Sequence, residues 1–368
     1  MKKLAFGLMR LPVIDGDATK IDLEKVKEMV DTFIGRGFSY FDTAYVYHGG
    51  YSERAFGQLV AARYPRDKFT ITNKMPMFSP KNPEDYERIF NEQLERCQVE
   101  YFDWYFLHAL NIRTYEEYVL KENAFDFVFK KKAEGKIKHV GFSFHDSAEV
   151  LDRILTENPN VELVQLQINY IDYESEAIQS RKCYEVARKH GKPITIMEPL
   201  KGGKLINIPD EAKKLFKDYH PDLSIASWGI RYASSLDGVV ATLSGMSNME
   251  QVLDNTSYME NFEPLSEEEY QVIERVVDII NKAIAIPCTG CRYCVDGCPM
   301  HIAIPEYFSL LNDLKQFGPN DYRKNRYQKI AETNGLASSC IECGQCEGIC
   351  PQHLHIIDAL KKVVKEFE

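Results

Sequence analysis

The stretch FSYFDTAYVY (38–47) begins with an aromatic-rich pattern typical of a β-strand and ends in a group of polar side chains. Seven other short runs, rich in β-branched and aromatic residues, have the same character: KKLAFGL (2–8), KFTITNK (68–74), DWYFLHA (103–109), KIKHVGFS (136–143), ELVQLQIN (162–169), KPITIME (192–198) and GVVATLS (238–244). Longer segments separate these runs, and four of them carry apolar residues at helical spacing: 21–36, 83–99, 147–157 and 175–190. The sequence therefore predicts strands and helices in alternation.

This alternation fits one fold best. Eight strands and their helices within about 250 residues match the number and size of a (β/α)8 barrel, an α/β fold. The alternative is a doubly wound open sheet, which normally carries a GxGxxG loop after its first strand. Here Gly7 is followed by LMRLPVIDG, which lacks that pattern. The barrel is therefore the favoured fold.

The last hundred residues have a different character. Their helical patterns lie at 266–283, near 305–316 and 320–333, and at about 354–367. Ser266 and Glu269 form a capping box at the start of the first of these helices. We expect a barrel over 1–265, a linking helix over 266–284 and a small all-helical unit over 285–368.

The composition excludes several classes of protein. Of 368 residues, 44% are hydrophobic and 27% charged, as in ordinary globular proteins. A net charge of −10 argues against nucleic acid as a partner, because phosphate binding requires an excess of cations. No apolar run approaches the roughly 18 residues of a membrane span, and MKKLAFGLMR (1–10) lacks a signal peptide's cleavage site. We therefore expect a cytoplasmic protein with no membrane partner.

The cysteines are concentrated near the end of the chain. Cys97 and Cys183 stand alone in helical patterns and are expected to be packing residues. The other eight form two runs of identical spacing, each followed by proline: Cys288, Cys291, Cys294 and Cys298 before Pro299, and Cys340, Cys343, Cys346 and Cys350 before Pro351. In the absence of a signal peptide, metal binding in a reducing compartment is expected rather than disulfides.

The spacing of both runs indicates iron–sulfur clusters. Cysteines separated by two, two and three residues and followed by proline form the bacterial [4Fe–4S] ligand run, whose fourth cysteine binds the neighbouring cluster. We therefore expect one cluster on Cys288, Cys291, Cys294 and Cys350, and the other on Cys340, Cys343, Cys346 and Cys298. Two structural zinc sites are the alternative, although zinc favours pairs of CxxC knuckles. The unit resembles the all-helical dicluster ferredoxin domains attached to larger redox enzymes.

Side chains suited to proton transfer follow three predicted barrel strands. Asp42 and Tyr47 follow the second strand, Lys74 ends the third and His108 ends the fourth. Barrel chemistry takes place at the carboxyl ends of the strands, so these side chains are expected to converge. A buried lysine lowers the pKa of a neighbouring phenol, an aspartate keeps the lysine charged, and a histidine polarises a carbonyl. Tyr47 would then be the general acid of carbonyl reduction, or the base of the reverse reaction, with hydride from a nicotinamide.

These motifs resemble those of the aldo-keto reductase family over residues 1–262. FDTAYVY (41–47) resembles the family's second-strand motif, ITNKM (71–75) its lysine strand and YFLH (105–108) its histidine strand. The resemblance implies a catalytic tetrad of Asp42, Tyr47, Lys74 and His108.

The resemblance also implies where a nicotinamide cofactor binds. GFS (141–143) implies Ser143 as a partner of the carboxamide, although Phe144 replaces the asparagine that often follows. VQLQINY (164–170) implies Gln165 as the other partner, with Asn169 nearby.

The segments after the last two strands match the family less completely. Met197 replaces the aromatic residue that often stacks on nicotinamide, and Glu198 replaces a serine. PLKGG (199–203) matches the loop beyond, which implies Leu200 and Gly202.

The adenosine segment is LSGMSNMEQVLDN (243–255), which implies Asn248, Gln251 and Asn255. The cations that hold a 2′-phosphate in NADPH-preferring members fall on Gly245 and Gln251, so NADH is slightly favoured over NADPH.

Three functions fit the combination of barrel and clusters. The first is an oxidoreductase acting on a small carbonyl or alcohol, whose clusters exchange electrons with a protein donor or acceptor. A flavin would ease the conversion of two-electron to one-electron transfer, but the sequence carries no signature for one. The second is a carbonyl reductase with structural or redox-sensing clusters, and the third is a non-catalytic nucleotide-binding electron carrier or regulatory subunit. An exposed basic run could dock an acidic carrier: Arg323, Lys324, Arg326 and Lys329.

Overall fold

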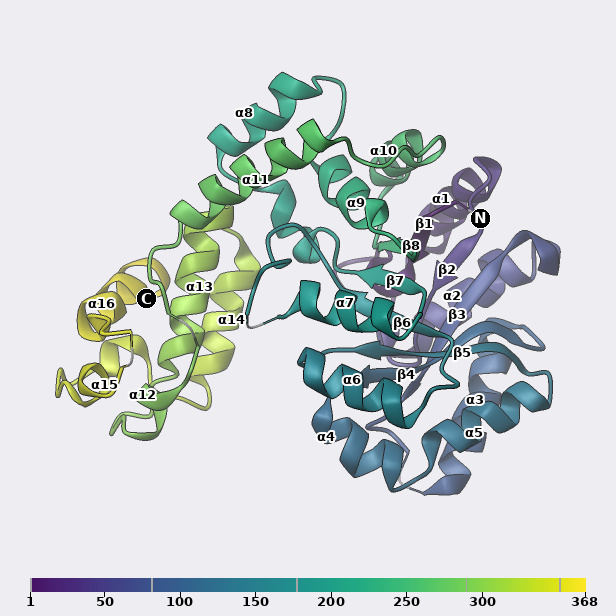
Figure 1. Ribbon diagram of the computed structural model, residues 1–368, viewed down its shortest axis with the longest axis horizontal. Helices are drawn as coiled ribbons and strands as arrows, with labels where there is room; N and C mark the ends of the chain where they lie inside the picture. Colours follow the sequence, from purple (N-terminus) through teal and green to yellow (C-terminus); the bar gives the residue numbers. More distant parts are fainter. Residues whose placement is uncertain (1, 81, 177, 289, 351) are drawn as a thin grey trace. The chain divides into compact units, whose positions relative to one another are not determined.

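The computed structural model describes residues 2–80, 82–176, 178–288, 290–350 and 352–368. Eight parallel strands close into a barrel in the order β1 to β8 (Figure 1). The strands are β1 (Leu4–Gly7), β2 (Tyr40–Asp42), β3 (Thr70–Pro76), β4 (Phe102–Leu110), β5 (Ile137–Phe144), β6 (Leu163–Gln167), β7 (Ile194–Met197) and β8 (Val239–Ser244). Closure is made by β1 and β8, from Leu4 opposite Thr242 to Phe6 opposite Ser244. The predicted (β/α)8 barrel is confirmed.

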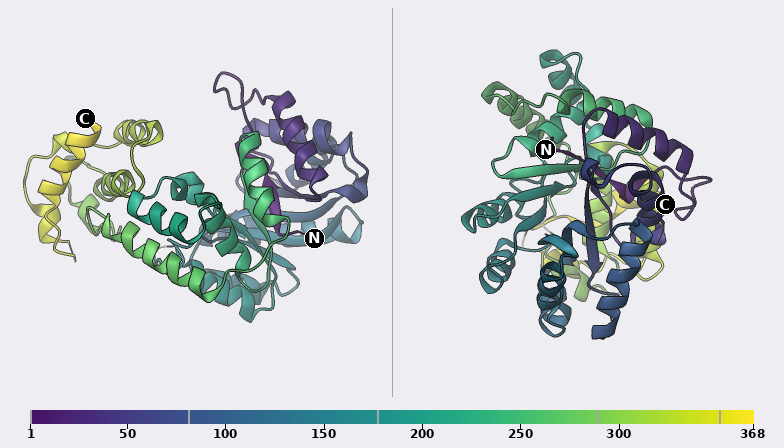
Figure 2. Two further views of the ribbon diagram at one scale, coloured as in Figure 1. Left: turned by 90° about the horizontal axis from the view of Figure 1, so that it is seen from above. Right: turned by 90° about the vertical axis from the view of Figure 1, so that its right-hand side faces the viewer.

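Helices surround the barrel strands, as the two views of Figure 2 show. They are α1 (Leu23–Gly35), α2 (Tyr51–Phe56), α3 (Pro83–Cys97), α4 (Ile112–Thr114), α5 (Ala124–Ala133), α6 (Ala148–Glu157), α7 (Ser180–Lys189), α9 (Ile225–Ser235) and α10 (Met249–Met259). Throughout the residues that the structure describes, no helix is long and apolar enough to cross a membrane.

Helix α1 packs on the barrel through an aromatic cluster. The ring centroid of Phe33 on α1 lies 5.4 Å from that of Phe6 on β1 and 5.5 Å from that of Phe41 on β2. Both contacts have the edge-to-face geometry that aromatic pairs favour. Because Phe41 directly precedes Asp42, this packing fixes the end of β2, where the first candidate catalytic residue lies.

Strand β4 is irregular where it ends. Its pairing with β5 shifts register between Leu107 and Leu110, and Ala109 adopts a φ of 57°. This left-handed conformation is unfavourable for a residue with a Cβ. The irregularity immediately follows His108, so it sets the direction in which that side chain leaves the strand.

By packing, the chain divides into two compact units. One comprises Met1–Gly202 with Leu223–Ser266, and the other Gly203–Asp222 with Glu267–Glu368. The second unit therefore includes a segment from the connection that follows β7. The domain limits expected from the sequence, 1–265, 266–284 and 285–368, remain a prediction.

The second unit is all helical. Its helices are α8 (Asp210–Tyr219), α11 (Glu267–Lys282), α12 (Tyr293–Asp296), α13 (Ile304–Phe317), α14 (Asp321–Ala331), α15 (Gln345–Gly348) and α16 (Ile356–Phe367). Aliphatic and aromatic side chains form its core: Ile286, Ile304, Tyr307, Phe308, Leu311, Tyr327, Ile356, Leu360 and Val363. Cys294, Cys346 and Cys350 are buried members of the same cluster. Such a small core gives limited stability by itself.

The close packing of the barrel wall at Gly141 gives a stability prediction. A Cβ added there would lie 2.6 Å from the Leu163 carbonyl oxygen and 2.7 Å from the Phe106 ring. Gly141→Ala should therefore destabilise the protein by about 1–3 kcal/mol, measured by urea unfolding followed by circular dichroism. Gly35→Ala on α1 is the control, because its Cβ would meet no atom within 4 Å; equal losses in both variants would contradict the prediction.

Candidate functional site

A buried ion pair lies at the carboxyl ends of β2 and β3. Lys74 Nζ donates hydrogen bonds to Asp42 Oδ1 at 2.5 Å and to the Thr43 carbonyl oxygen at 2.9 Å. The side chain of Lys74 is 0% exposed and that of Asp42 3%. Burial lowers the pKa of Lys74, but attraction to Asp42 and Tyr47 outweighs it, and the net pKa lies above the ordinary value. Lys74 is therefore a permanent positive charge at this site.

Tyr47 lies against this charge. The Lys74 ammonium is 5.1 Å from the centroid of the Tyr47 ring. Burial raises the pKa of the Tyr47 phenol, and the Asp42 and Glu198 carboxylates act in the same direction, while the Lys74 charge opposes them. The lowered pKa that the sequence predicts beside a lysine is therefore wrong: the net shift is upward because desolvation outweighs the Lys74 charge. Tyr47 therefore holds its proton at neutral pH.

His108 completes the group. Its ring meets the Tyr47 ring edge to face, with centroids 5.9 Å apart and an interplanar angle of 79°. Burial lowers the pKa of His108 to about 3, and the charges of Lys74 and His145 add to this effect. The buried Nδ1 atom has no hydrogen-bond partner among the residues described. His108 is thus a neutral imidazole that can donate one N–H to a bound molecule.

The structure therefore brings together all four residues of the expected tetrad. A phenol that retains its proton, a fixed ammonium beside it and a neutral imidazole can jointly bind and protonate a carbonyl oxygen.

The expected partners of the nicotinamide carboxamide are Ser143 and Gln165. Each retains a hydrogen-bonding group that could meet a ligand. Ser143 Oγ accepts a hydrogen bond from Ala109 N–H at 2.8 Å, which leaves its hydroxyl hydrogen free to donate. Gln165 Nε2 donates to Asp42 Oδ2 at 3.2 Å, which leaves its amide oxygen free to accept. One donor and one acceptor complement a carboxamide, so these residues fit the group.

The loop after β7 is built from left-handed residues. Glu198, Lys201 and Gly202 have φ values of 60°, 48° and 66°. Met197 is partly buried and packs against the barrel interior, and Leu200 is partly buried in the same loop.

A cation missed by the sequence analysis, Arg10, lies beside this loop. Its Nη2 is 3.8 Å from Glu198 Oε1. The same Nη2 atom lies close to Gly202, and the aliphatic stem of the side chain packs on Gly245. It was missed because β1 and the loops after β7 and β8 are far apart in sequence and become neighbours only when the barrel closes.

The resemblance places three asparagine and glutamine residues near the adenosine. Each of them forms hydrogen bonds to other residues of the chain. Asn248 Oδ1 accepts from Gln251 N–H at 2.9 Å and thereby caps α10, and Gln251 Oε1 accepts from Ser247 N–H at 2.7 Å. Asn255 is buried, donates to Ser244 Oγ at 2.8 Å and accepts from Tyr258. The amide nitrogens of Asn248 and Gln251 are the groups left to meet a ligand.

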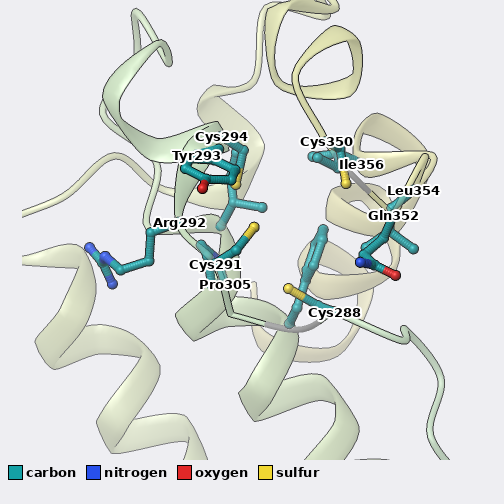
Figure 3. Close-up of a pocket in the computed structure, with 12 residues that line it drawn as sticks. Cys288, Cys291, Arg292, Tyr293, Cys294, Pro305, Cys350, Gln352, Leu354 and Ile356 are labelled. Carbon is teal, nitrogen blue, oxygen red and sulfur yellow. The ribbon is translucent and has the colours of Figure 1, made fainter. Parts of the chain in front are cut away.

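The cysteines of the second unit form two groups that cross between the runs. Cys288, Cys291, Cys294 and Cys350 line one pocket, and Figure 3 shows their sulfur atoms around a common space. Cys298, Cys340, Cys343 and Cys346 line a second pocket. These are the two sets expected from the spacing. Pro351 lies outside the described residues.

The chemistry of both pockets suits iron–sulfur clusters. All ten cysteines are free thiols, so each pocket has four sulfur ligands available. Burial raises the pKa of Cys294 and of Cys346 to about 11, so their thiolates require the positive charge of bound iron. A zinc site requires ligands about 2.3 Å from one point, and within the described ranges no three His, Cys, Asp or Glu side chains gather closely enough to hold one ion.

Other expected features have mixed outcomes. Cys97 and Cys183 are buried, as packing residues should be. In the basic run on α14, Arg323 is only 3% exposed and donates to the Gly318 carbonyl oxygen. It is therefore not part of an exposed basic surface, whereas Lys324, Arg326 and Lys329 are exposed.

The closed parallel barrel and the residues at its carboxyl edge define the class of protein as a (β/α)8-barrel oxidoreductase. Residues 3–278 match the aldo/keto reductase family. Because this match covers most of the chain, the protein belongs to that family. Residues 287–355 match the 4Fe-4S dicluster domain.

Three relatives match this chain over 31% to 68% of its length. L-galactose dehydrogenase of Arabidopsis thaliana is 23% identical over 252 residues, which cover 62% of this chain and 76% of the relative. The uncharacterized oxidoreductase YqkF of Bacillus subtilis is 23% identical, over 68% and 87% of the two chains. Norsolorinic acid reductase of Aspergillus flavus is 29% identical over 31% of this chain, and the match spans about a third, 32%, of that protein.

Solved structures share the fold. An aldo-keto reductase from Klebsiella pneumoniae in complex with NADPH superposes with a TM-score of 0.60 at 19% identity, over 75% of this chain and 90% of that chain. The holo form of an aldo-keto reductase from Bacillus halodurans superposes with a TM-score of 0.58 at 21% identity, over 74% and 91%.

The crossed grouping of the cysteines is open to test. After anaerobic reconstitution, Cys350→Ala and Cys291→Ala should each retain about four of eight irons and leave the same cluster in the electron spin resonance spectrum. Cys298→Ala and Cys343→Ala should both leave the other cluster. A Cys350→Ala spectrum that matches Cys343→Ala instead would contradict the grouping.

Proposed function

We propose that the protein transfers hydride between a nicotinamide cofactor and a small carbonyl or alcohol, with Tyr47 as general acid or base. The observation that carries this proposal is the position of Lys74, a buried cation between Asp42 and Tyr47. An ammonium there favours the phenolate that remains after proton donation, at the point where charge develops. The relatives support both directions of reaction, since one is named a dehydrogenase and another a reductase.

Each residue of the site would have a separate role in the proposed reaction. His108, as a neutral imidazole, would hold the carbonyl oxygen by a hydrogen bond next to the Tyr47 hydroxyl. Tyr47 would pass its proton to that oxygen, and the Lys74 charge would stabilise the resulting phenolate. Asp42 keeps Lys74 charged and in place. Ser143 and Gln165 would bind the carboxamide of a nicotinamide, which supplies the hydride when bound.

The choice between NADH and NADPH stays a prediction. The sequence favours NADH because neither Gly245 nor Gln251 is a cation. However, the aliphatic stem of Arg10 packs on Gly245 and its guanidinium lies near Gly202 and Glu198, and the Klebsiella structure contains NADPH. The case for NADH therefore still depends on both Gly245 and Gln251.

The two cluster pockets suit a path for electrons to a protein donor or acceptor. Ile304 lines both pockets, so the proposed clusters would be neighbours. Cys291 and Cys343, one from each pocket, are exposed, so each cluster would have a corner accessible to a partner. No flavin signature is present in the sequence.

A second candidate function makes the clusters structural or redox-sensing. It is favoured by the burial of Cys294, Cys346 and Cys350 within the core of the second unit, since bound metal supplies folding energy to small units. A non-catalytic nucleotide-binding subunit is the third candidate. It would have no need of the arrangement around Tyr47.

Tyr47→Phe tests whether the barrel is catalytic. Removing the acidic hydroxyl should lower the rate of carbonyl reduction by about 10²- to 10⁴-fold, measured with a panel of small aldehydes and ketones and either nucleotide. Tyr51→Phe is the matched control, because Tyr51 is 48% exposed. Unchanged turnover in Tyr47→Phe would contradict catalysis by this residue.

The raised pKa of Tyr47 sets the pH dependence of the reductive reaction. The group must be protonated to act, so the rate should stay level between about pH 6 and pH 9 and fall only at more alkaline pH. His108, with a pKa of about 3, should add no step in this range. Measured profiles of kcat with a midpoint near pH 6.5 would show an ionising histidine and contradict the assignment.

Addition of NADH or NADPH to the anaerobic, reconstituted protein tests the link between barrel and clusters. If the two form one electron path, the visible absorbance of the clusters should bleach, with a reduced-cluster signal in electron spin resonance. Bleaching by dithionite but not by nucleotide, in the presence of a reducible or oxidisable substrate, would favour structural clusters.

A further inference from the structure

A group of buried polar side chains behind β3 has no part in the proposed proton transfer. It joins Glu53 of α2, Asn73 of β3, Gln93 of α3 and Tyr105 of β4, each of them 0% exposed. A buried carboxylate is costly unless its oxygen atoms accept hydrogen bonds. The arrangement around Glu53 therefore requires a structural or functional reason.

Glu53 is the centre of this group. Its Oε1 accepts hydrogen bonds from Asn73 Nδ2 at 2.9 Å and from Gln93 Nε2 at 3.0 Å. Its Oε2 accepts one from Arg96 Nη1 at 3.1 Å. Burial raises the pKa of Glu53, and these three donors oppose that shift.

The carboxylate fixes the orientation of both amides. As an acceptor only, it requires Asn73 and Gln93 to present their NH₂ groups. Asn73 Oδ1 then accepts from Lys74 N–H at 2.8 Å, and Gln93 Oε1 accepts from the Tyr105 hydroxyl. Gln93 Nε2 also donates to the Lys74 carbonyl oxygen at 3.0 Å. Both main-chain polar groups of Lys74 are therefore held by this network.

Lys74 needs these partners because its neighbouring strand ends early. The last pair between β2 and β3 is Asp42 with Thr72, whereas β3 continues to Pro76. Alternate residues of a strand turn their main-chain groups to the same side, and Thr72 bonds toward β2 through Thr43 N–H. Lys74 faces that side as well, where β2 has no residue opposite it. The side-chain amides of Asn73 and Gln93 bond the Lys74 main chain where a longer β2 would otherwise do so.

We propose that Glu53 and Gln93 are positioning residues for Lys74, which hold its main chain so that its ammonium stays between Asp42 and Tyr47; this inference rests on the proposed carbonyl chemistry. Neither side chain reaches the reacting groups. Their effect passes through the peptide of Lys74. A displacement of about 1 Å in a catalytic group can cost on the order of 100-fold in rate, so a loosened peptide should reduce turnover.

Two variants and a matched control test the proposal in the full-length, cluster-containing protein. Glu53→Gln keeps the shape of the side chain. Its NH₂ group, however, would face N–H donors whose hydrogen bonds the carboxylate now accepts. Gln93→Met removes the bond to the Lys74 carbonyl oxygen. Glu92→Gln is the control, because Glu92 bonds Arg96 Nη2 and the Tyr45 hydroxyl, both at 3.0 Å, but neither Asn73 nor Gln93.

We expect kcat to fall at least tenfold in both variants with little change in KM, and to stay near wild type in Glu92→Gln. The oxidative reaction requires the Tyr47 phenolate. Its pH midpoint should move upward, because a displaced Lys74 ammonium stabilises that phenolate less. Amide hydrogen exchange measured by mass spectrometry should speed up in peptides that contain Lys74, a readout that needs no turnover.

Each other outcome has a definite meaning. Wild-type kcat and pH midpoint in both variants would overturn the proposal, even if exchange at Lys74 were faster, because the network would then be structural only. Equal losses in Glu92→Gln, or losses that parallel a drop in melting temperature, would overturn it too. Absence of turnover in the wild-type protein itself would instead refute the proposed function.

Discussion

The buried ion pair between Lys74 and Asp42 is the constraint on which the candidate site depends. A fully buried ammonium is stable only where its hydrogen atoms are accepted, here by Asp42 and by the Thr43 carbonyl oxygen. Loss of one partner of such a pair leaves an uncompensated charge that costs about 3–5 kcal/mol. The end of β2 and the adjoining part of β3 therefore have little freedom to vary. Burial has the largest effect on the pKa values of Tyr47 and His108, and the Lys74 charge lowers both.

Much of this architecture could be read from the sequence because it is local. Each of the eight strands is a short run of β-branched and aromatic residues, and the fold follows from counting them. Helix limits are harder to predict where polar side chains build turns. Residues 175–190 have helical spacing, but α7 begins only at Ser180, since Gln179 adopts a left-handed φ of 56°. Spacing of apolar residues does not reveal such a conformation.

The features that sequence reasoning missed depend on contacts between distant segments. Arg10 reaches the loops after β7 and β8 through barrel closure, and Glu53 meets Gln93 because α2 and α3 pack together. Arg323 illustrates the opposite error. It belongs to a run of basic residues, yet it is buried together with Tyr327, one helical turn further along α14. Charge along the sequence does not show which face of a helix is covered.

The segment 203–222 bears on how the two parts of this chain could be separated. Helix α8 belongs to this segment and packs on α11, with Ala212 and Phe216 buried on α8 and Val272 and Val276 buried on α11. The helical unit is thus assembled from two pieces of chain, one of which interrupts the barrel's own order of strands. The unit therefore could not be removed, or grafted onto another barrel, by dividing the chain at a single position. Any recombination that exchanged the cluster-bearing end would also have to exchange the connection after β7.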